Sequence, residues 1–204
     1  MQERAGQTRE LLLRAAAEAF DELGYAGTSV SKILERAGLT AGAMYFHFAS
    51  KEELARAVVL EQAADVRFPD EGDGLQRLVN LTQHLAVEMQ RNTLLRAGVR
   101  LAVDQSAAGF EDYAIYEWWT EQFRRRLVRT RELGELLPGV DEGEFAEQLV
   151  AGYTGSQIMS RISSGRADLP QRIATLWRYL LPAIDPPDVI RRVDLSPARR
   201  EDVP

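Results

Sequence analysis

The chain has 204 residues, a formal net charge of −6, no cysteine and a hydrophobic fraction of 45%. This length suits one domain of ordinary size plus a small one, and the lack of cysteine excludes disulfides and thiolate metal sites and fits a cytoplasmic protein. No apolar stretch reaches about 18 residues, and the first ten residues, MQERAGQTRE, lack the apolar segment of a signal peptide, so we expect neither a membrane span nor a leader.

A first helix is predicted from about residue 7 to residue 23, because all eight prolines lie at or after Pro69 and leave this region uninterrupted. Gly24 is expected to end it. The inward face of this helix is expected to carry five apolar residues at helical spacing: Leu12, Ala16, Ala19, Phe20 and Leu23.

Residues 28–51, TSVSKILERAGLTAGAMYFHFASK, have the pattern of a helix-turn-helix followed by an aromatic block. Hydroxyl residues can cap the first short helix, namely Thr28, Ser29 and Ser31. The apolar face of that helix carries Val30, Ile33 and Leu34. The next three residues, AGL, then form a tight turn in which Gly38 can take a positive φ.

Thr40 is expected to cap a second short helix, over residues 41–46, whose small first residues let the backbone approach a flat surface closely. A helix whose N-terminal half enters the major groove reads DNA, so this segment predicts DNA binding. Phe46 and Phe48 are assigned to the core of this region, and His47 to a structural or phosphate-facing role rather than a ligand role.

The rest of the chain is expected to be helical. Ser50 caps a fourth helix that runs to about residue 66, and a polar, turn-rich stretch over residues 67–74 follows it. Further amphipathic segments cover residues 75–91, 93–103, 111–133, 143–163 and 170–181, and strand signals are lacking. The predicted fold class is all-α, with a DNA-binding domain over residues 1–51, a larger ligand-binding and dimerisation domain over 52–185, and a fraying tail over 186–204.

Three features together resemble the TetR family of transcriptional repressors: the first-helix pattern AAAEAFDELGYAGTSV, the turn at Gly38 and the run GAMYFHFASKEEL. Short helix-turn-helix units also occur as plain packing corners, but here the pattern extends over about fifty residues. The resemblance implies a TetR-like fold with DNA contacts from Ser29, Ser31, Thr40, Ala41, Gly42, Tyr45 and Lys51. Lys32 is a further candidate, with a solvated surface lysine as the alternative.

Two observations limit what the resemblance implies about DNA. The position of Ala41 is very often lysine in the family, so the operator preference cannot be copied from relatives. Residues 1–52 also carry six Lys and Arg against seven Asp and Glu, whereas nucleic-acid binders usually show a basic surface. We therefore expect moderate affinity with a modest dependence on salt.

Beyond the N-terminal region, three segments resemble the γ-butyrolactone autoregulator receptors of actinobacteria: LLRAGVRLAVDQ, GELLPGVD and LLPAID. These repressors respond to small butyrolactones, butenolides or furans that control antibiotic production. The resemblance implies an apolar pocket with a few polar anchors. It selects Trp119 as a pocket wall rather than Trp118, which lies about 100° around the same helix.

Thr154 and Gln62 are the predicted polar anchors of the ligand. The other predicted lining residues are Leu85, Val99, Val103, Phe123 and Ile158, each of which can equally be ordinary core. Trp119 can likewise be a core aromatic, and Gln62 can be an exposed side chain. No metal site and no cofactor are expected.

Two half-sites of a pseudo-palindromic operator require a homodimer. The resemblance places its interface on the helices predicted over residues 143–163 and 170–181. Candidate contacts are Gly155, Ile158, Met159, Ile162, Leu176 and Leu180. A ligand that touches Gln62 would shift the fourth helix and so alter the spacing of the two DNA-binding domains.

Three other functions compete with this prediction. A TetR-type repressor of an efflux or catabolic gene would respond to unrelated apolar drugs or metabolites, and another type of receptor would bind DNA but ignore lactones. An enzyme is disfavoured, because His47 and His84 lie in different domains without a nucleophile or a metal partner at useful spacing.

Overall fold

The computed structural model of the chain describes residues 2–63, 66, 72–104 and 113–198. The described residues form helices and connecting turns, with no strand among them, so the all-α prediction is confirmed. The chain divides into two compact units, residues 1–66 with 92–115 and residues 67–91 with 116–204. The predicted boundary between residues 51 and 52 divides the chain by expected function, whereas the two compact units divide it by packing. The boundary therefore stays a prediction.

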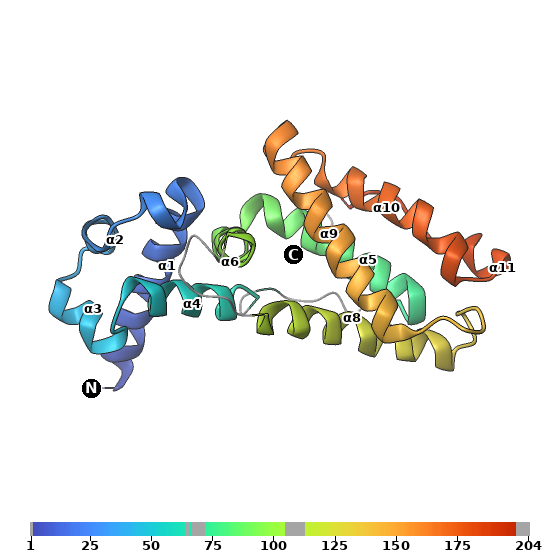
Figure 1. Cartoon of the computed structure of the whole chain (residues 1–204), viewed down its shortest axis with the longest axis horizontal. Coiled ribbons are helices and arrows are strands. Elements are labelled where there is room, and N and C mark those ends of the chain that lie inside the picture. The colour runs from blue at the N-terminus through green and yellow to red at the C-terminus, as the bar shows by residue number, and fades with distance from the viewer. Residues whose placement is uncertain (1, 64–65, 67–71, 105–112, 199–204) are drawn as a thin grey trace. The chain divides into compact units, whose positions relative to one another are not determined.

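The first unit contains the N-terminal helices and one helix from the middle of the chain (Figure 1). Its helices are α1 (Gln2–Gly27), α2 (Val30–Ala37), α3 (Ala41–His47), α4 (Lys51–Glu61) and α6 (Thr93–Val103). Helix α1 packs against each of the other four. An ion pair of 2.7 Å between Arg96 Nε and Asp21 Oδ2 also joins α6 to α1.

The inward face of α1 is buried as predicted at four of its five positions, namely Leu12, Ala16, Ala19 and Phe20. The prediction for Leu23 is wrong, because this side chain is 41% exposed. Leu23 lies in the last turn before Gly24, whose φ of 70° and ψ of 176° take the chain out of helical geometry. Since the helix is interrupted there, its apolar face is not continued into the core beyond Phe20.

Local hydrogen bonds define the helix-turn-helix as predicted. The side chain of Ser29 accepts a bond from the Lys32 backbone N–H at the start of α2, and Thr40 caps α3 in the same way. Gly38 ends α2 with a φ of 65°, in the left-handed region that glycine adopts without strain. The buried Thr28 hydroxyl donates to the carbonyls of Ala19 and Gly24 at 3.0 and 2.7 Å, which fixes the corner between α1 and α2.

The aromatic block after α3 is only partly buried. Met44 and Phe48 lie in the core, as predicted for Phe48. The prediction for Phe46 is wrong, because its side chain is 78% exposed. Residues two positions apart on a helix point to nearly opposite sides, so a short helix that buries Met44 turns Phe46 outward. The Phe46 ring instead contacts the edge of the neighbouring His47 ring.

Helix α4 is shorter than predicted. Its N-cap is Ser50, as expected, but it ends at Glu61 rather than near residue 66, and Gln62 is its C-cap. Gly98 of α6 faces this end of α4. A Cβ atom on Gly98 would lie 2.3 Å from the Cβ of Gln62 and 3.0 Å from the Val58 carbonyl oxygen, so only glycine permits this approach of the two helices.

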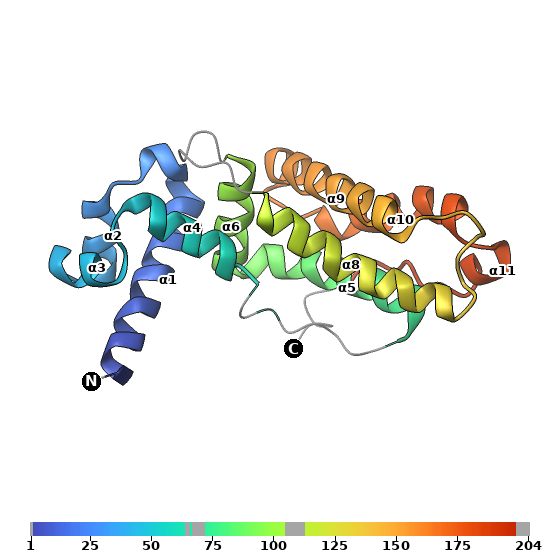
Figure 2. The ribbon, with the colours of Figure 1, turned by 60° about the horizontal axis from the view of Figure 1, so that its bottom comes forward.

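The second unit is a helical bundle (Figure 2). Its helices are α5 (Gly74–Arg91), α8 (Ala114–Glu132), α9 (Glu142–Ser164), α10 (Leu169–Ile184) and α11 (Pro187–Ile190). The first two residues of α8 belong to the first unit. Helix α10 packs against both α5 and α9. At its centre the fully buried Trp177 donates a 2.7 Å hydrogen bond to the hydroxyl of Thr82 on α5, which satisfies both polar groups.

The tail was predicted to fray, and for residues 186–198 that prediction is wrong. Residues 187–190 form α11, and Val189 is buried. Further along, Gln76 of α5 exchanges two hydrogen bonds with the backbone of Asp194, and the Ala198 backbone N–H donates to Gln83 at 3.3 Å. Polar side chains of α5 thus supply hydrogen-bond partners for the backbone of the tail, which composition does not reveal. Residues 199–204 lie outside the described part.

Replacing Gly98 with alanine should destabilise the protein by about 1–3 kcal/mol, because the added methyl group overpacks the contact with Gln62 and Val58. Urea unfolding monitored by circular dichroism measures this change. Gly6→Ala is the matched control, since Gly6 lies in helix α1 with no atom within 4 Å of an added Cβ. If Gly98→Ala unfolds at the same urea concentration as the unmodified protein, the contact between α4 and α6 tolerates a methyl group and does not require glycine.

Candidate DNA-binding and ligand-binding sites

The residues predicted to contact DNA lie together on the α2–α3 corner of the first unit. Ser29 and Thr40 are the N-caps of the two helices, and their hydroxyl oxygens already accept a backbone hydrogen bond. Ser31, Ala41 and Gly42 are exposed, and Tyr45 is 57% exposed. Because the hydroxyl hydrogens of the capping residues remain free to donate, this surface can still offer donors to phosphate oxygens.

The two predicted lysines make contacts within the chain. The Lys51 ammonium donates to the carbonyls of Tyr25 and Thr28 at 3.0 and 2.9 Å and lies 3.9 Å from the centre of the Tyr25 ring. Burial lowers the pKa of this ammonium. Lys32 donates to the Gly27 carbonyl at 3.0 Å. Both lysines therefore satisfy carbonyls at the end of α1, a role that their sequence positions did not predict.

The charge around this corner is largely balanced within the protein. Arg36 at the end of α2 donates two hydrogen bonds, of 3.0 and 2.8 Å, to the Glu22 carboxylate on α1. It also lies 3.6 Å from a carboxylate oxygen of Glu18. The Arg36 guanidinium lowers the pKa of Glu22, as expected for such a pair. Because this arginine is already paired within the chain, our expectation of a modest salt dependence stays a prediction.

Three predicted ligand residues belong to the first unit. Gln62 is only 1% exposed, so the alternative of an exposed side chain is excluded. Its Nε2 donates to the Val59 carbonyl at 2.9 Å, while its Oε1 is buried and accepts no hydrogen bond from the described residues. A buried acceptor without a donor is costly, and a bound molecule with an N–H or O–H group would satisfy it. Val99 is half-buried on α6, and Val103 is exposed near its end.

The other five predicted ligand residues lie in the second unit. Leu85 on α5 and Phe123 on α8 are buried. Trp119 is half-buried, with its ring centre 6.1 Å from that of Phe123, whereas its neighbour Trp118 is 39% exposed. This difference agrees with the choice of Trp119 as the inner residue. Thr154 and Ile158 are half-buried on α9. The structure thus joins Trp119 and Phe123, and their ligand role stays a prediction.

Sequence reasoning missed Tyr153, which directly precedes Thr154 on α9. Its hydroxyl oxygen is buried and has no hydrogen-bond partner among the described residues. Burial raises the pKa of this phenol, so it stays a neutral donor at physiological pH. A tyrosine hydroxyl that is buried without a partner is a candidate anchor for a polar ligand group. A hydroxyl residue beside Thr154 was the only sequence signal, and it could not reveal burial.

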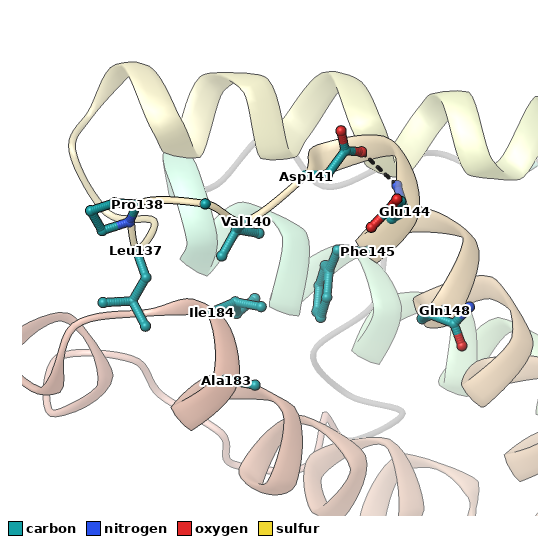
Figure 3. Close-up of a pocket in the computed structure, with 10 residues that line it drawn as sticks. Leu137, Pro138, Val140, Asp141, Glu144, Phe145, Gln148, Ala183 and Ile184 are labelled. Carbon is teal, nitrogen blue, oxygen red and sulfur yellow. Dashed lines mark hydrogen bonds between the residues drawn. The ribbon is translucent and has the colours of Figure 1, made fainter.

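The pocket shown in Figure 3 is a different place in the second unit. It has a volume of about 410 Å³ and lies between the connection from α8 to α9 (residues 137–141), the start of α9 and the end of α10. Leu137, Phe145 and Ile184 supply apolar walls, and Asp141 and Glu144 supply carboxylates. None of the eight predicted ligand residues lines it. This hollow therefore gives no support to the predicted lactone site.

The predicted dimer helices expose apolar side chains. On α9, Met159 and Ile162 are exposed, and an added Cβ on Gly155 would meet no atom within 4 Å. Gly152 has a different role, because its Cβ would lie 3.3 Å from Leu176, so it permits the close packing of α9 on α10 within the chain. Exposed large apolar residues on one helix face are typical of a surface that another chain covers.

Within the described ranges no group of three or more His, Cys, Asp or Glu residues is placed to hold a metal ion. None of the helices in the same ranges is long and apolar enough to cross a membrane.

Comparison with known proteins assigns the family. Residues 12–58 match the bacterial regulatory proteins of the tetR family, and residues 73–186 match the tetracyclin repressor-like C-terminal domain. The chain is 41% identical over 208 residues to the A-factor receptor protein of Streptomyces griseus, a match that covers 98% of this chain and 74% of that protein.

Solved structures similar to this chain indicate the same family. Native TylP, a TetR regulator from Streptomyces fradiae, superposes with a TM-score of 0.86 at 41% identity, covering 98% of this chain and 97% of TylP. An ArpA-like γ-butyrolactone receptor superposes with a TM-score of 0.72 at 31% identity, covering 94% of this chain and 96% of that receptor. The chain therefore belongs to the TetR family of bacterial regulatory proteins.

Proposed function

We propose that this protein is a transcriptional repressor that binds a pseudo-palindromic operator as a homodimer and is released by a small γ-butyrolactone, butenolide or furan. The observation that carries the proposal is the 41% identity to the A-factor receptor protein over 98% of the chain, which extends through both units. The genes under its control are those of antibiotic production, as in the receptors that the chain resembles. Such a regulator acts by binding rather than catalysis, and it works in the cytoplasm, where the operator is.

The DNA contacts come from the α2–α3 corner. Tyr45 and the hydroxyls of the two N-caps, Ser29 and Thr40, donate to phosphates and fix the register of the protein on the duplex. Ser31, Ala41 and Gly42 face the bases or the backbone at close range, with Ala41 limited to apolar contact. Lys32 and Lys51 each retain ammonium hydrogens beyond those bound to carbonyls, so both can also contribute charge to a nearby phosphate.

The homodimer holds two such corners one helical turn apart on the DNA. Its interface is formed by α9 and α10, where the exposed Met159 and Ile162 find cover and the open space at Gly155 admits a side chain of the second copy. Ile158, Leu176 and Leu180, which are half-buried in the single chain, complete the contact.

The ligand is bound through an apolar wall and a few polar anchors. In the second unit, Trp119, Phe123, Leu85 and Ile158 form the wall, and the hydroxyls of Thr154 and Tyr153 bind polar groups of the lactone. The ligand roles of Gln62, Val99 and Val103, which belong to the first unit, stay predictions from the resemblance. A buried lactone with such anchors can provide the roughly 5.5 kcal/mol of differential affinity that full switching requires.

Helix α4 transmits the signal to the DNA-binding corner. Gln62 caps the end of this helix, and Lys51 at its start is bonded to the carbonyls of Tyr25 and Thr28. A shift of Gln62 toward the ligand therefore moves the α1–α2 corner with it. Displacement of both corners in the dimer changes their separation and weakens operator binding.

Fluorescence anisotropy tests this function directly. Labelled duplex DNA from upstream of the protein's own gene is titrated with the protein, and a panel of butyrolactones and butenolides is then added to the complex. Release by one compound at low concentration supports the proposal. Release only by diverse apolar drugs at high concentration would replace the lactone with an efflux-type inducer, and release by no compound would remove the ligand assignment.

Tyr45→Phe should weaken operator binding by about twofold to tenfold per protomer, because one hydroxyl hydrogen bond to a phosphate is lost. Tyr113→Phe is the matched control, since Tyr113 is also exposed and lies outside the α2–α3 corner. Anisotropy with the same labelled DNA measures both variants. Equal affinity of Tyr45→Phe and Tyr113→Phe would remove Tyr45 from the DNA contacts.

Trp119→Ala should raise the lactone concentration needed for half-release of DNA by about tenfold or more, because the ligand loses an aromatic wall of its pocket. Trp118→Ala, one residue earlier on the same helix, should change this concentration much less, since Trp118 points further outward. DNA affinity without ligand serves as the folding check for both variants. If the two variants require the same lactone concentration, Trp119 does not line the pocket.

A further inference from the structure

Asp185 is a buried carboxyl group that the proposed function does not use. It is the C-cap of α10, and its backbone N–H donates to the Leu181 carbonyl at 2.9 Å. The residue is only 2% exposed, and neither oxygen of its side chain accepts a hydrogen bond from the described residues. A carboxylate that loses its water without gaining donors is unfavourable, so burial opposes the charged form of this group.

The residues that follow Asp185 explain why its carboxyl lacks donors. An aspartate side chain in a turn commonly accepts a hydrogen bond from the backbone N–H two residues later. Positions 186 and 187 are both prolines, which have no N–H to donate. The turn after α10 therefore offers the side chain of Asp185 no local partner.

Three segments of the C-terminal unit meet beside Asp185. Directly before it, the Ile184 carbonyl accepts a 2.7 Å hydrogen bond from the backbone N–H of Leu137, which lies between α8 and α9. On the same connection, Glu135 accepts a 3.0 Å hydrogen bond from the backbone N–H of Leu75 in the first turn of α5. The connection from α8 to α9 is thus bonded to the start of α5 and to the end of α10, with a carboxyl group at each bond.

Glu135 is the charged group that acts on Asp185. Its carboxylate binds a backbone N–H at the start of α5, where the helix dipole stabilises negative charge. A second negative charge close to it would be repelled. Burial, and in addition the charge of Glu135, raise the pKa of Asp185 to about 7.

Among the described residues no cation compensates the Asp185 carboxylate. Charged groups elsewhere on the adjoining segments interact with one another or with water. Ion pairs join Asp73 to Arg129, Arg131 to Glu142 and Asp188 to Arg192, Arg77 acts on Asp73, and Arg178, Asp141 and Glu144 are exposed. Within the described part of the chain, a proton is therefore the remaining means of neutralising Asp185.

We propose that Asp185 is a proton-binding site of the C-terminal unit, whose carboxyl is neutral in the folded chain at mildly acidic pH and releases its proton above neutrality. In the neutral form, the end of α10 packs against the connection from α8 to α9 without a buried charge. After the proton leaves, the carboxylates of Asp185 and Glu135 repel each other and weaken this contact. The site acts independently of the operator and of the lactone.

The direction of the pH dependence follows from comparison with the unfolded chain. There an aspartate carboxyl has a pKa of about 4, whereas the pKa of Asp185 in the folded chain is about 7. Folding therefore takes up a proton between these two values. The stabilisation that the neutral carboxyl provides is fully present below the lower value and is lost as the pH rises through the upper one.

Thermal unfolding of the full-length protein and of Asp185→Asn, followed by circular dichroism at pH 5 and pH 8, tests the proposal. Asparagine has nearly the same shape as aspartate and cannot ionise. The melting temperature of the variant, minus that of the unmodified protein, should rise by about 5 °C or more from the lower to the higher pH. Because the test concerns a change with pH, a constant cost of the asparagine amide cancels.

Asp188→Asn is the matched control, since Asp188 lies on the neighbouring α11 and its side chain is 66% exposed. Its melting temperature should differ from that of the unmodified protein by the same amount at both pH values. The proposal is overturned if the difference for Asp185→Asn is also independent of pH, or if both variants show the same rise.

Two measurements on the unmodified protein distinguish a proton from a metal ion. Carbon-13 NMR of the aspartate carboxyls should show one group that titrates at a pH of about 7, and titration of all of them below about pH 5 would overturn the proposal. At pH 8, magnesium chloride should give the same melting temperature as sodium chloride of equal ionic strength. A rise with magnesium as large as the effect of Asp185→Asn would assign this carboxyl to a cation instead.

Discussion

The close contact between α4 and α6 is the constraint on which the packing of the N-terminal unit depends. Glycine at position 98 brings α6 onto the end of α4 and leaves the Gln62 side chain almost completely buried, with one acceptor unsatisfied. A larger residue at position 98 would separate the helices and release Gln62 to water. The same contact therefore holds α6 against α4 and keeps an unsatisfied, buried acceptor at the end of α4.

At its other end, α4 is held by the Lys51 ammonium, which binds two carbonyls and the ring of Tyr25. The single hydroxyl hydrogen of Thr28 is shared between the carbonyls of Ala19 and Gly24 on α1. These bonds tie the short helices α2 and α4 to the longer α1, and isolated helices below about 12–15 residues are marginal in water. The α2–α3 corner is thus tied to both α1 and α4. Under the proposed function, a shift of α4 would move this corner and change the separation of the two corners in the dimer.

Local patterns in the sequence predicted much of this structure. The caps Ser29, Thr40 and Ser50, the turn at Gly38 and the helix bounds of α5 and α6 follow from residues within one or two turns of each other. The outcomes at Leu23 and Phe46, the early end of α4 and the ordered tail depend on contacts between segments far apart in the chain. The same holds for the carbonyl contacts of Lys51 and the buried hydroxyl of Tyr153. Periodicity identifies a buried face, but it does not tell where a neighbouring helix stops covering it.

The acidic composition of the chain is compatible with DNA binding, because the basic residues near the α2–α3 corner interact with groups close to them in the same chain. Arg36 is paired with carboxylates of α1, and the lysines near the corner donate hydrogen bonds to carbonyls of their own chain.

The most direct test of the proposed switch is the distance between the two α2 helices of the dimer. A spin label on Glu35→Cys reports it by pulsed electron resonance, since the chain has no other cysteine and Glu35 is exposed. A lactone that releases DNA should change this distance, and Gln62→Ala should abolish the change. Release of DNA with an unaltered distance would contradict transmission through α4.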